Sequence, residues 1–504
     1  MRNESITQLF RGLRLFAILA CLTLGVARAP HGADQDMFSV YDLNIDGLTL
    51  GVMSGDFNGD KAGDVAVVYY PWQNEDDRRF IAVFFQTNGA YVRQPNALVQ
   101  LPGPLTQFQV VDLENDGLAE ILAVDDAGAQ VIRYSRDKGF APPARVIRRE
   151  SSYNAGKFHG CIVANAAFDI LSPAGREIAM PTTDGVALFK LGAKGSYALS
   201  GELALAGAGE SVQPRTDIFA RRHTGAYIYE PTVLRVADAN GDARPDIYAT
   251  QGDRVAQFLQ DDAGAFSRVA DRVVKLARFG SREGIMVEWA DLNGDRKLDV
   301  VCGRMSGGVA EAEMSVDVYL ADATGLINKT PNKTITLSQA RSEIFVADVS
   351  GDRAPELILA TVELGSLATV KMLMQQKGAM HLLVYPLAGG LPQERSPVRV
   401  KLEFSLSLAN AAPEQEVALC LDGDYNGDGR MDVAFSNGAG AVQIYPGQAQ
   451  GYIASEPLVE VLLPDVTDIL CAELNGDGRS DALVERPAEK NSRVTVLMSR
   501  RGTR

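Results

Sequence analysis

The sequence predicts an all-β fold, an eight-bladed β-propeller whose blades each contain four strands. Three observations predict it. A nine-residue acidic pattern occurs eight times, an apolar run of strand length lies on each side of it, and a third strand follows that ends in a glycine turn. Four-stranded units repeated in this way are typical of a radial ring, in which each sheet packs on its neighbours. We therefore expect a repeat architecture rather than several independent domains.

The nine-residue pattern reads carboxylate, any residue, Asn, Gly, Asp, three further residues and a second carboxylate. Five copies keep it whole, and they begin at Asp56, Asp238, Asp291, Asp424 and Glu473. Two copies drift, beginning at Asp112 and Asp348. The remaining copy, the third along the chain, keeps only its ends, Asp169 and Glu177, and has Leu171 and Pro173 inside it. The copies start 49 to 76 residues apart, which identifies a long structural repeat.

The flanking residues define the rest of the unit. Ile344–Ala347 precedes one loop and Leu357–Leu359 follows it, and both runs are apolar and partly β-branched, as strands are. A third strand then ends in a turn such as Gly264-Ala-Phe266. The third repeat keeps this turn at Gly195-Ser-Tyr197, although its acidic loop is degraded. Each repeat therefore predicts strands A to D, with the acidic loop joining A to B.

The two ends of the chain predict that the ring closes on itself. The last repeat supplies strands A, B and C, the third at Val494–Met498, and reaches Gly502 where its C–D turn should begin. Phe38–Asp42 has the pattern of the missing D strand and comes directly before the first repeat. Eight loops and one shared blade favour eight blades. A seven-bladed ring with one irregular unit is the alternative.

The acidic loops predict calcium sites. Calcium prefers roughly six to eight hard oxygen ligands, and side chains at loop positions 1, 3, 5 and 9 can supply them, with a main-chain carbonyl at position 7. Position 4 is Gly, or Asn115 in the second loop, and both residues tolerate a positive φ. The absence of His and Cys from these positions disfavours zinc and copper. The alternative is a set of metal-free Asp/Asn-Gly turns. We favour metal because turn chemistry alone gives no reason for a carboxylate at position 9.

The predicted calcium ligands occupy positions 1, 3, 5 and 9 of seven loops. They are Asp56, Asn58, Asp60, Asp64, Asp112, Glu114, Asp116, Glu120, Asp238, Asn240, Asp242, Asp246, Asp291, Asn293, Asp295, Asp299, Asp348, Ser350, Asp352, Glu356, Asp424, Asn426, Asp428, Asp432, Glu473, Asn475, Asp477 and Asp481. Seven divalent ions would offset most of the formal net charge of −15. We expect these ions to be structural, because unscreened carboxylates in one short loop repel each other.

The N-terminal residues 1–29 are predicted to be a signal peptide. Arg2, Arg11 and Arg14 precede the apolar run Leu15–Val26, and small residues follow it. A lipoprotein anchored at Cys21 is the alternative. Residues 36–504 are then expected to form one exported propeller domain, in a secreted, periplasmic or cell-surface location. No other apolar stretch reaches ~18 residues, so no transmembrane span is expected.

The charge also limits the partners. A net charge of −15 disfavours nucleic acid and anionic membranes, which require a basic surface. Four cysteines remain after the signal peptide, in strand contexts without metal-ligand spacing, and we interpret them as core residues. The alternative that two of them form a disulfide in an oxidising compartment is left open, because the sequence cannot assign a pairing. A polysaccharide or an extracellular protein is the expected partner.

The loops resemble those of the FG-GAP/VCBS repeat family, whose Val-Ala-Asp-x-Asn-Gly-Asp motif is present at Val236–Asp242. The resemblance covers essentially all of residues 36–504. It implies a propeller like the head of integrin α subunits, with calcium in the A–B hairpins. Members of the family are adhesion heads, lectin-like modules or propeller domains of secreted enzymes, including some polysaccharide lyases. The third loop departs from the family pattern because it lacks the ligands.

The extra length of the long repeats is predicted on the face opposite the acidic loops. Strands alternate in direction, so A–B and C–D turns share one face, and B–C and D–A connections share the other. Insertions fall in residues 205–230, 363–380 and 404–416, and Ser366–Lys377 is expected to be a short helix ended by Gly378. Insertions on a rigid scaffold often carry binding sites.

Three functions are compatible with this face. The first is a non-catalytic binding or adhesion module, with Trp72 and the 205–230 segment as candidate contacts. The second is a lyase-like enzyme acting on a polysaccharide, with His223 or a nearby Tyr as general base. The third is a structural component of a surface assembly. Alternatively, the aromatic and basic side chains on this face are scattered loop residues without a function.

Overall fold

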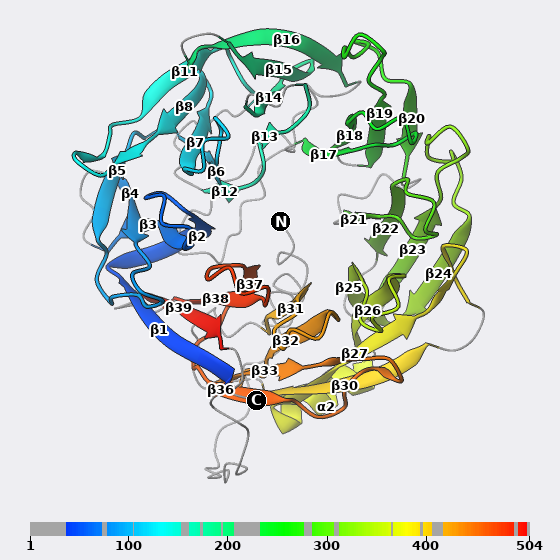
Figure 1. Cartoon of the computed structure of the whole chain (residues 1–504). Coiled ribbons are helices and arrows are strands. Elements are labelled where there is room, and N and C mark those ends of the chain that lie inside the picture. The colour runs from blue at the N-terminus through cyan, green and yellow to red at the C-terminus, as the bar shows by residue number, and fades with distance from the viewer. Residues whose placement is uncertain are drawn as a thin grey trace.

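The computed structural model describes most of the chain. The described residues are 37–72, 78–103, 105–152, 161–171, 175–192, 195–205, 232–251, 253–276, 285–306, 312–363, 366–393, 397–405, 417–487 and 492–500. They form eight sheets of four or five mostly antiparallel strands, arranged around a central axis, and three two-stranded ribbons (Figure 1). The all-β, eight-bladed propeller is therefore confirmed, and the seven-bladed alternative is wrong.

The blades follow one another along the chain, each with its innermost strand first. Blades 1 to 4 consist of β2 (Gly47–Gly55), β3 (Asp64–Pro71), β4 (Arg79–Phe84) and β5 (Ala97–Leu101); β6 (Gln107–Val111), β7 (Glu120–Asp125), β8 (Gly128–Ile132) and β11 (Ala144–Arg148); β13 (Ala167–Phe168), β14 (Glu177–Thr182), β15 (Gly185–Leu191) and β16 (Tyr197–Ala204); and β17 (Val233–Ala237), β18 (Asp246–Gln251), β19 (Arg254–Phe258) and β20 (Arg272–Lys275).

Blades 5 to 8 repeat the arrangement. They consist of β21 (Ile285–Ala290), β22 (Asp299–Ser306), β23 (Glu313–Tyr319) and β24 (Lys333–Ser338); β25 (Ala340–Ala347), β26 (Glu356–Glu363), β27 (Lys377–Tyr385) and β30 (Val398–Ser405); β31 (Leu419–Gly423), β32 (Asp432–Ser436), β33 (Ala441–Tyr445) and β36 (Val459–Leu462); and β37 (Asp468–Ala472), β38 (Asp481–Arg486), β39 (Ser492–Ser499) and β1 (Phe38–Ile45). Some C–D turns carry two-residue ribbons: β9 (Tyr134–Ser135) with β10 (Gly139–Phe140), β28 (Leu387–Ala388) with β29 (Leu391–Pro392), and β34 (Gly447–Gln448) with β35 (Tyr452–Ile453).

The hydrophobic core lies between neighbouring blades. Strand β26 is buried on both faces over seven successive residues, whereas the outer strand β24 alternates between half-buried and exposed positions. Ile358 of blade 6 and Val433 of blade 7 belong to one buried cluster. An apolar B strand therefore stabilises two interfaces at once, because each of its faces packs on a different blade.

The ring closes as the chain ends predict. Strand β1 pairs antiparallel with β39, from Phe38 opposite Ser499 to Ile45 opposite Ser492. At this junction the Asp42 carboxylate accepts hydrogen bonds from Arg486 and Thr495. Strand β1, the first strand of the chain in the described residues, is thus the outer strand of the last blade.

Blades 2 and 3 depart from the regular pattern. The short strand β12 (Ile162–Val163) pairs in parallel with β6 and makes blade 2 five-stranded. The A strand of blade 3, β13, then has only two residues. The segment that should form the inner edge of blade 3 is therefore partly used by blade 2.

The helix expected in the insertion of blade 6 is present as α2 (Ser366–Gln375). Gln376 follows it in the left-handed region, with a φ of 52°. The expectation that Gly378 ends the helix is wrong, because Gly378 is already in β27. A Cβ at this position would stand 2.2 Å from the Phe404 ring.

Several sequence expectations fall outside the described residues. They include the signal peptide 1–29, Cys21, and residues 206–230 of the 205–230 segment, with His223. Among the described residues, no helix has both the length and the apolar character needed to cross a membrane. The four cysteines of the described part of the chain are unpaired thiols, two of them buried.

Candidate functional site

The seven predicted ligand sets all lie in A–B connections, at one face of the ring. In all eight A–B loops the position-9 carboxylate accepts a hydrogen bond of 2.8–3.1 Å from the main-chain N–H at position 2. The position-9 residues are Asp64, Glu120, Glu177, Asp246, Asp299, Glu356, Asp432 and Asp481. Each begins strand B and is buried. The carboxylate therefore holds the loop against the strand that follows it.

The second oxygen of the same carboxylate reaches strand C. In five loops it accepts a hydrogen bond of 2.7–3.0 Å from an N–H at or just past the end of that strand, donated by Gln86, Gln260, Ala321, Gly447 and Ser499. Position 9 thus links strands A, B and C through its own hydrogen bonds. The inference that turn geometry gives no reason for this carboxylate is wrong, since a buried N–H needs an acceptor.

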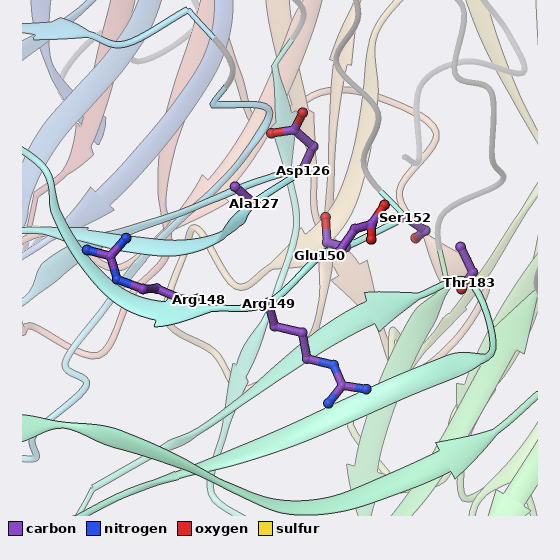
Figure 2. A pocket seen from close by; sticks show the side chains of 8 residues that line it. Asp126, Ala127, Arg148, Arg149, Glu150, Ser152 and Thr183 are labelled. Carbon is purple, nitrogen blue, oxygen red and sulfur yellow. The ribbon is translucent and has the colours of Figure 1, made fainter.

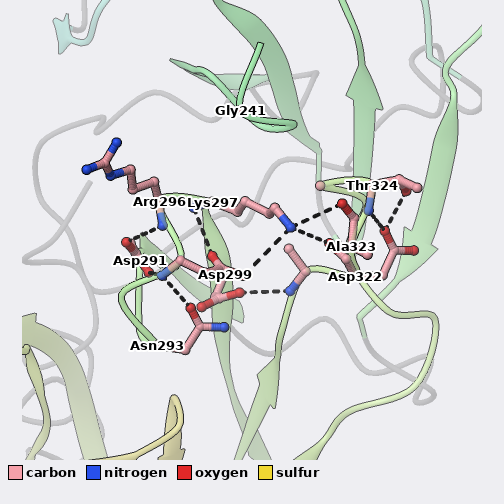
Figure 3. Close-up of polar contacts among 12 residues, drawn as sticks. Gly241, Asp291, Asn293, Arg296, Lys297, Asp299, Asp322, Ala323 and Thr324 are labelled. Carbon is pink, nitrogen blue, oxygen red and sulfur yellow. Dashed lines mark hydrogen bonds and ion pairs between the residues drawn. The ribbon is translucent and has the colours of Figure 1, made fainter. Parts of the chain in front are cut away.

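Positions 1, 3 and 5 organise the loop itself, as the fifth repeat shows (Figure 3). Asp291 accepts hydrogen bonds from the N–H groups of Gly294, at 2.7 Å, and Arg296, at 2.7 Å. Asn293 accepts one from the N–H of Asp295, at 2.9 Å. Asp295 accepts one from the N–H of Lys297, at 3.0 Å. These side chains therefore turn inward and shape a tight loop, as Asx turns do.

Two loop positions adopt left-handed backbone conformations in all seven loops. Position 4 has φ of 53–82° and is Gly or Asn115, as the sequence predicts. Position 6 has φ of 65–85°, which the sequence analysis missed. Its residues are Lys61, Gly117, Ala243, Arg296, Arg353, Gly429 and Gly478. The glycines at position 6 of three loops were the available signal, because glycine adopts this conformation without strain.

The loops concentrate negative charge. Burial raises the pKa of Asp64 to about 7, against the lowering effect of two main-chain hydrogen bonds, and the carboxylates of Asp60 and Asp56 raise it further. The pKa of Asp432 is likewise raised to about 7 and that of Asp481 to about 6, in both cases chiefly by burial. A buried carboxylate whose neighbours are also acidic is stabilised in its ionised form by a cation.

The donor set fits calcium in type and charge. It consists of carboxylate, amide and main-chain oxygens, which are the ligands that calcium prefers. Within the described part of the chain, however, no three His, Cys, Asp or Glu side chains converge as a ready-made metal cage. The carboxylates at positions 1 and 5 instead point to N–H groups of their own loop. Occupancy of these seven ligand sets therefore stays a prediction.

An arginine lies beside the acidic positions of both the second and the third loop. The Arg133 guanidinium lies 2.8 Å from the Glu114 carboxylate and 4.0 Å from that of Glu120. Arg176, at position 8 of the third loop, donates to the main-chain oxygen of Asp112 at 3.1 Å and lies 3.7 Å from the Asp169 carboxylate. The Arg176 guanidinium thus contacts the loops of both blades at the junction of blades 2 and 3.

Successive loops are hydrogen-bonded to each other around the ring. The position-8 N–H of one loop donates to a main-chain oxygen at position 1 or 2 of the preceding loop, at 2.7–2.9 Å, in the pairs Ala119 to Asp56, Arg176 to Leu113, Met431 to Asp348, Ser480 to Asp424 and Gly63 to Leu474. The last pair joins blade 1 to blade 8. Pro245 and Pro355 occupy position 8 in two other loops and have no N–H to donate.

C–D turns also cover the loop of the preceding blade. The Arg136 guanidinium, in the turn of blade 2, donates to the Asn58 carbonyl of the first loop at 2.8 and 3.1 Å. In blade 5, a Cβ at Gly325 would stand 1.9 Å from the Ala239 carbonyl of the fourth loop, and Gly325 has a φ of 79°. Glycine is needed there both for the backbone conformation and for the close approach. An ion in one loop would therefore stabilise the interface with the next blade.

The opposite face of the ring carries a polar cavity of about 510 Å³ between blades 2 and 3 (Figure 2). Its lining residues are Asp126, Ala127, Arg148, Arg149, Glu150, Ser151, Ser152 and Thr183. The sequence analysis missed it because these residues form no motif and come from two repeats. Tyr69, in β3 of blade 1, is buried in the core.

Residues 238–302 and 424–484 match the family model of the FG-GAP-like repeat. These segments are FG-GAP-like repeats. Each contains two of the acidic loops, those that begin at Asp238 and Asp291 and those that begin at Asp424 and Glu473. The resemblance inferred from the loop residues is confirmed over these two FG-GAP-like regions. A search of curated protein sequences found no match.

Several solved structures are similar to the chain at low identity. An Agrocybe aegerita lectin, solved for its recognition of non-reducing terminal N-acetylglucosamine, is 15% identical with a TM-score of 0.42, covering 74% of this chain and 96% of its own. The V. cholerae biofilm matrix protein Bap1 is 11% identical with a TM-score of 0.42, covering 93% and 92%. A putative 6-phosphogluconolactonase from Bacteroides fragilis is 13% identical with a TM-score of 0.36, covering 84% and 97%. At these scores no argument about function rests on them.

Proposed function

We propose that this chain is an exported, calcium-binding β-propeller that acts as a binding or adhesion module for a polysaccharide or an extracellular protein. The observation that carries the proposal is that the two faces of the ring differ in structure. The acidic loops and the C–D turns that cover them connect the blades on one face. The opposite face holds an open polar cavity. Such a scaffold suits recognition by a rigid surface.

In this proposal calcium is held by positions 1, 3, 5 and 9 of the seven loops and supplies the positive charge that the clustered carboxylates require. The chain's own residues do the remaining work. The position-9 carboxylate links strands A, B and C, and the position-8 N–H connects one loop to the next. Export, which follows from the predicted signal peptide, would place the protein where calcium is available.

The proposal is tested by applying the mature protein to an array of polysaccharides and glycans, in calcium and then in chelator. Binding to one glycan class that weakens in chelator is the expected result, since loss of calcium should loosen the interfaces between blades. Absence of binding in both conditions, together with no capture of purified extracellular proteins, would contradict a binding module.

A further inference from the structure

The cavity between blades 2 and 3 is built from connections on the face opposite the acidic loops. One side is the B–C turn of blade 2, at Asp126 and Ala127, and the other is the B–C turn of blade 3, at Thr183. The chain leaving β11, residues 148–152, runs between them (Figure 2). A volume of about 510 Å³ is within the range of small-molecule sites.

Main-chain hydrogen bonds from both blades hold the cavity in shape. The Ser151 N–H donates to the Asp126 carbonyl at 2.9 Å, and the Ser152 N–H donates to the Pro181 carbonyl of blade 3 at 2.9 Å. Below them the buried Asp125 carboxylate accepts hydrogen bonds from both terminal nitrogens of Arg145, at 2.5 and 2.6 Å. Walls fixed in this way lose little conformational freedom when a ligand binds.

The charges of the lining decide which ligand is favoured. Asp126 and Glu150 are acidic and exposed, and Arg148 and Arg149 are basic. The Arg149 guanidinium is already paired with the Glu202 carboxylate at 2.5 Å. In Figure 2 the Arg148 and Arg149 side chains extend in different directions. An anionic ligand would therefore meet more uncompensated carboxylate than guanidinium.

We propose that this cavity is a subsite for a sugar ring that carries no carboxylate, bound through its hydroxyl groups. The inference rests on the proposed binding function and specifies its ligand. Sugar hydroxyls both donate and accept hydrogen bonds, so they can use carboxylates, a guanidinium and the hydroxyls of Ser152 and Thr183 together. Hydrogen bonds to charged groups are stronger than those between neutral groups. The site disfavours uronate polymers and thereby separates this protein from the lyase-like alternative.

The test uses two probes that share one ring and differ in charge, glucose and glucuronate. Saturation-transfer NMR on the mature protein in calcium should show saturable binding of glucose and weaker binding of glucuronate. Glu150→Gln should weaken glucose binding roughly tenfold, because one charge-assisted hydrogen bond is lost. The matched control is Glu456→Gln, an exposed carboxylate in the C–D connection of blade 7, on the other face of the ring. It should bind glucose as the unmodified protein does.

The outcomes are separable. Binding of glucuronate as tight as that of glucose or tighter, or equal glucose binding by Glu150→Gln and the unmodified protein, would overturn the assignment. Failure of glucose, mannose and galactose to bind at all would also overturn it. If polysaccharide binding on the array persists in Glu150→Gln, the proposed function stands and the cavity is not its site. Equal melting temperatures of the two glutamine variants exclude misfolding as the cause of weaker binding.

Discussion

The A–B loops of the first and third repeats share one half of their structure and differ in the other. Both loops end in a buried carboxylate, Asp64 or Glu177, that accepts hydrogen bonds from main-chain N–H groups near the start of the loop. The first loop also has Asn58 and Asp60 at positions 3 and 5, whereas the third loop has Leu171 and Pro173 there and keeps only its end carboxylates. The position-9 carboxylate is therefore retained where the ligands at positions 3 and 5 are not. It serves the fold, and positions 3 and 5 are the part of the pattern that a metal explains.

The third loop also shows what can replace an ion. Arg176 reaches the Asp169 carboxylate and the main-chain oxygen of Asp112, in the loop of blade 2. A covalently attached cation thus contacts the loops of two blades, in the repeat whose loop lacks the ligands at positions 3 and 5. The comparison teaches that an interface between blades can be stabilised by either kind of charge, and each half of it can be tested separately.

The largest effect is expected from Glu177→Ala. The substitution leaves the buried N–H groups of Ile170 and Leu171 without their acceptor and should cost about 2–4 kcal/mol of unfolding free energy. Because this loop lacks calcium ligands, the loss should be equal in calcium and in chelator. Thermal melts in both conditions measure it, with the exposed Asp184→Ala as the control. A loss confined to calcium would mean that the position-9 carboxylate acts through a metal.

The second effect concerns the ligand half of the first loop. Asp60→Asn removes one of the three carboxylates that would face an ion, so it should lower the bound calcium by one ion per chain. A site filled at 100-fold its dissociation constant contributes about 2.7 kcal/mol. The variant should therefore melt earlier than the unmodified protein in calcium and at the same temperature in chelator. Atomic emission and paired melts give both quantities. Unchanged calcium content would contradict the assignment of this loop.

A smaller effect is expected from Arg176→Met, which keeps most of the side-chain length and removes the charge. The ion pair with Asp169 is partly exposed, so the loss should be about 1 kcal/mol and chiefly that of the hydrogen bond to Asp112. It should not depend on calcium. Urea unfolding in calcium and in chelator measures it, and a stability unchanged from the parent would show that Arg176 does not join the blades.

The smallest effect is a gain. Ala243 occupies position 6 of the fourth loop with a φ of 65°. Ala243→Gly should relieve the strain of this conformation and raise stability by about 0.5 kcal/mol, after the entropy cost of glycine in the unfolded chain. The reverse change at the same position of the seventh loop, Gly429→Ala, should lower stability by about 1 kcal/mol. Opposite signs of the two shifts in melting temperature are required for this interpretation.

The ring and its closure were predictable from the sequence because both depend on local sequence patterns. A loop flanked by two apolar runs recurs along the chain, and Phe38–Asp42 supplies the one strand that the last repeat lacks. The predicted ligand positions are likewise local. By contrast, the bonds from the position-9 carboxylate to the end of strand C depend on the fold of the blade. The pairing of β12 with β6 and the cavity between blades 2 and 3 depend on contacts between repeats, which no spacing within one repeat encodes.

The pairing of β1 with β39 has a consequence for the order of folding. Phe38 and Ser499 lie at opposite ends of the chain, so β1 emerges first during synthesis and waits for the last strand before it has a partner. Contacts of such long sequence separation form slowly, because the chain between them must first be brought together. Until then an unpaired, apolar edge is exposed, which is a risk for association between chains. The final step of folding is therefore expected to be the joining of the first strand to the last blade.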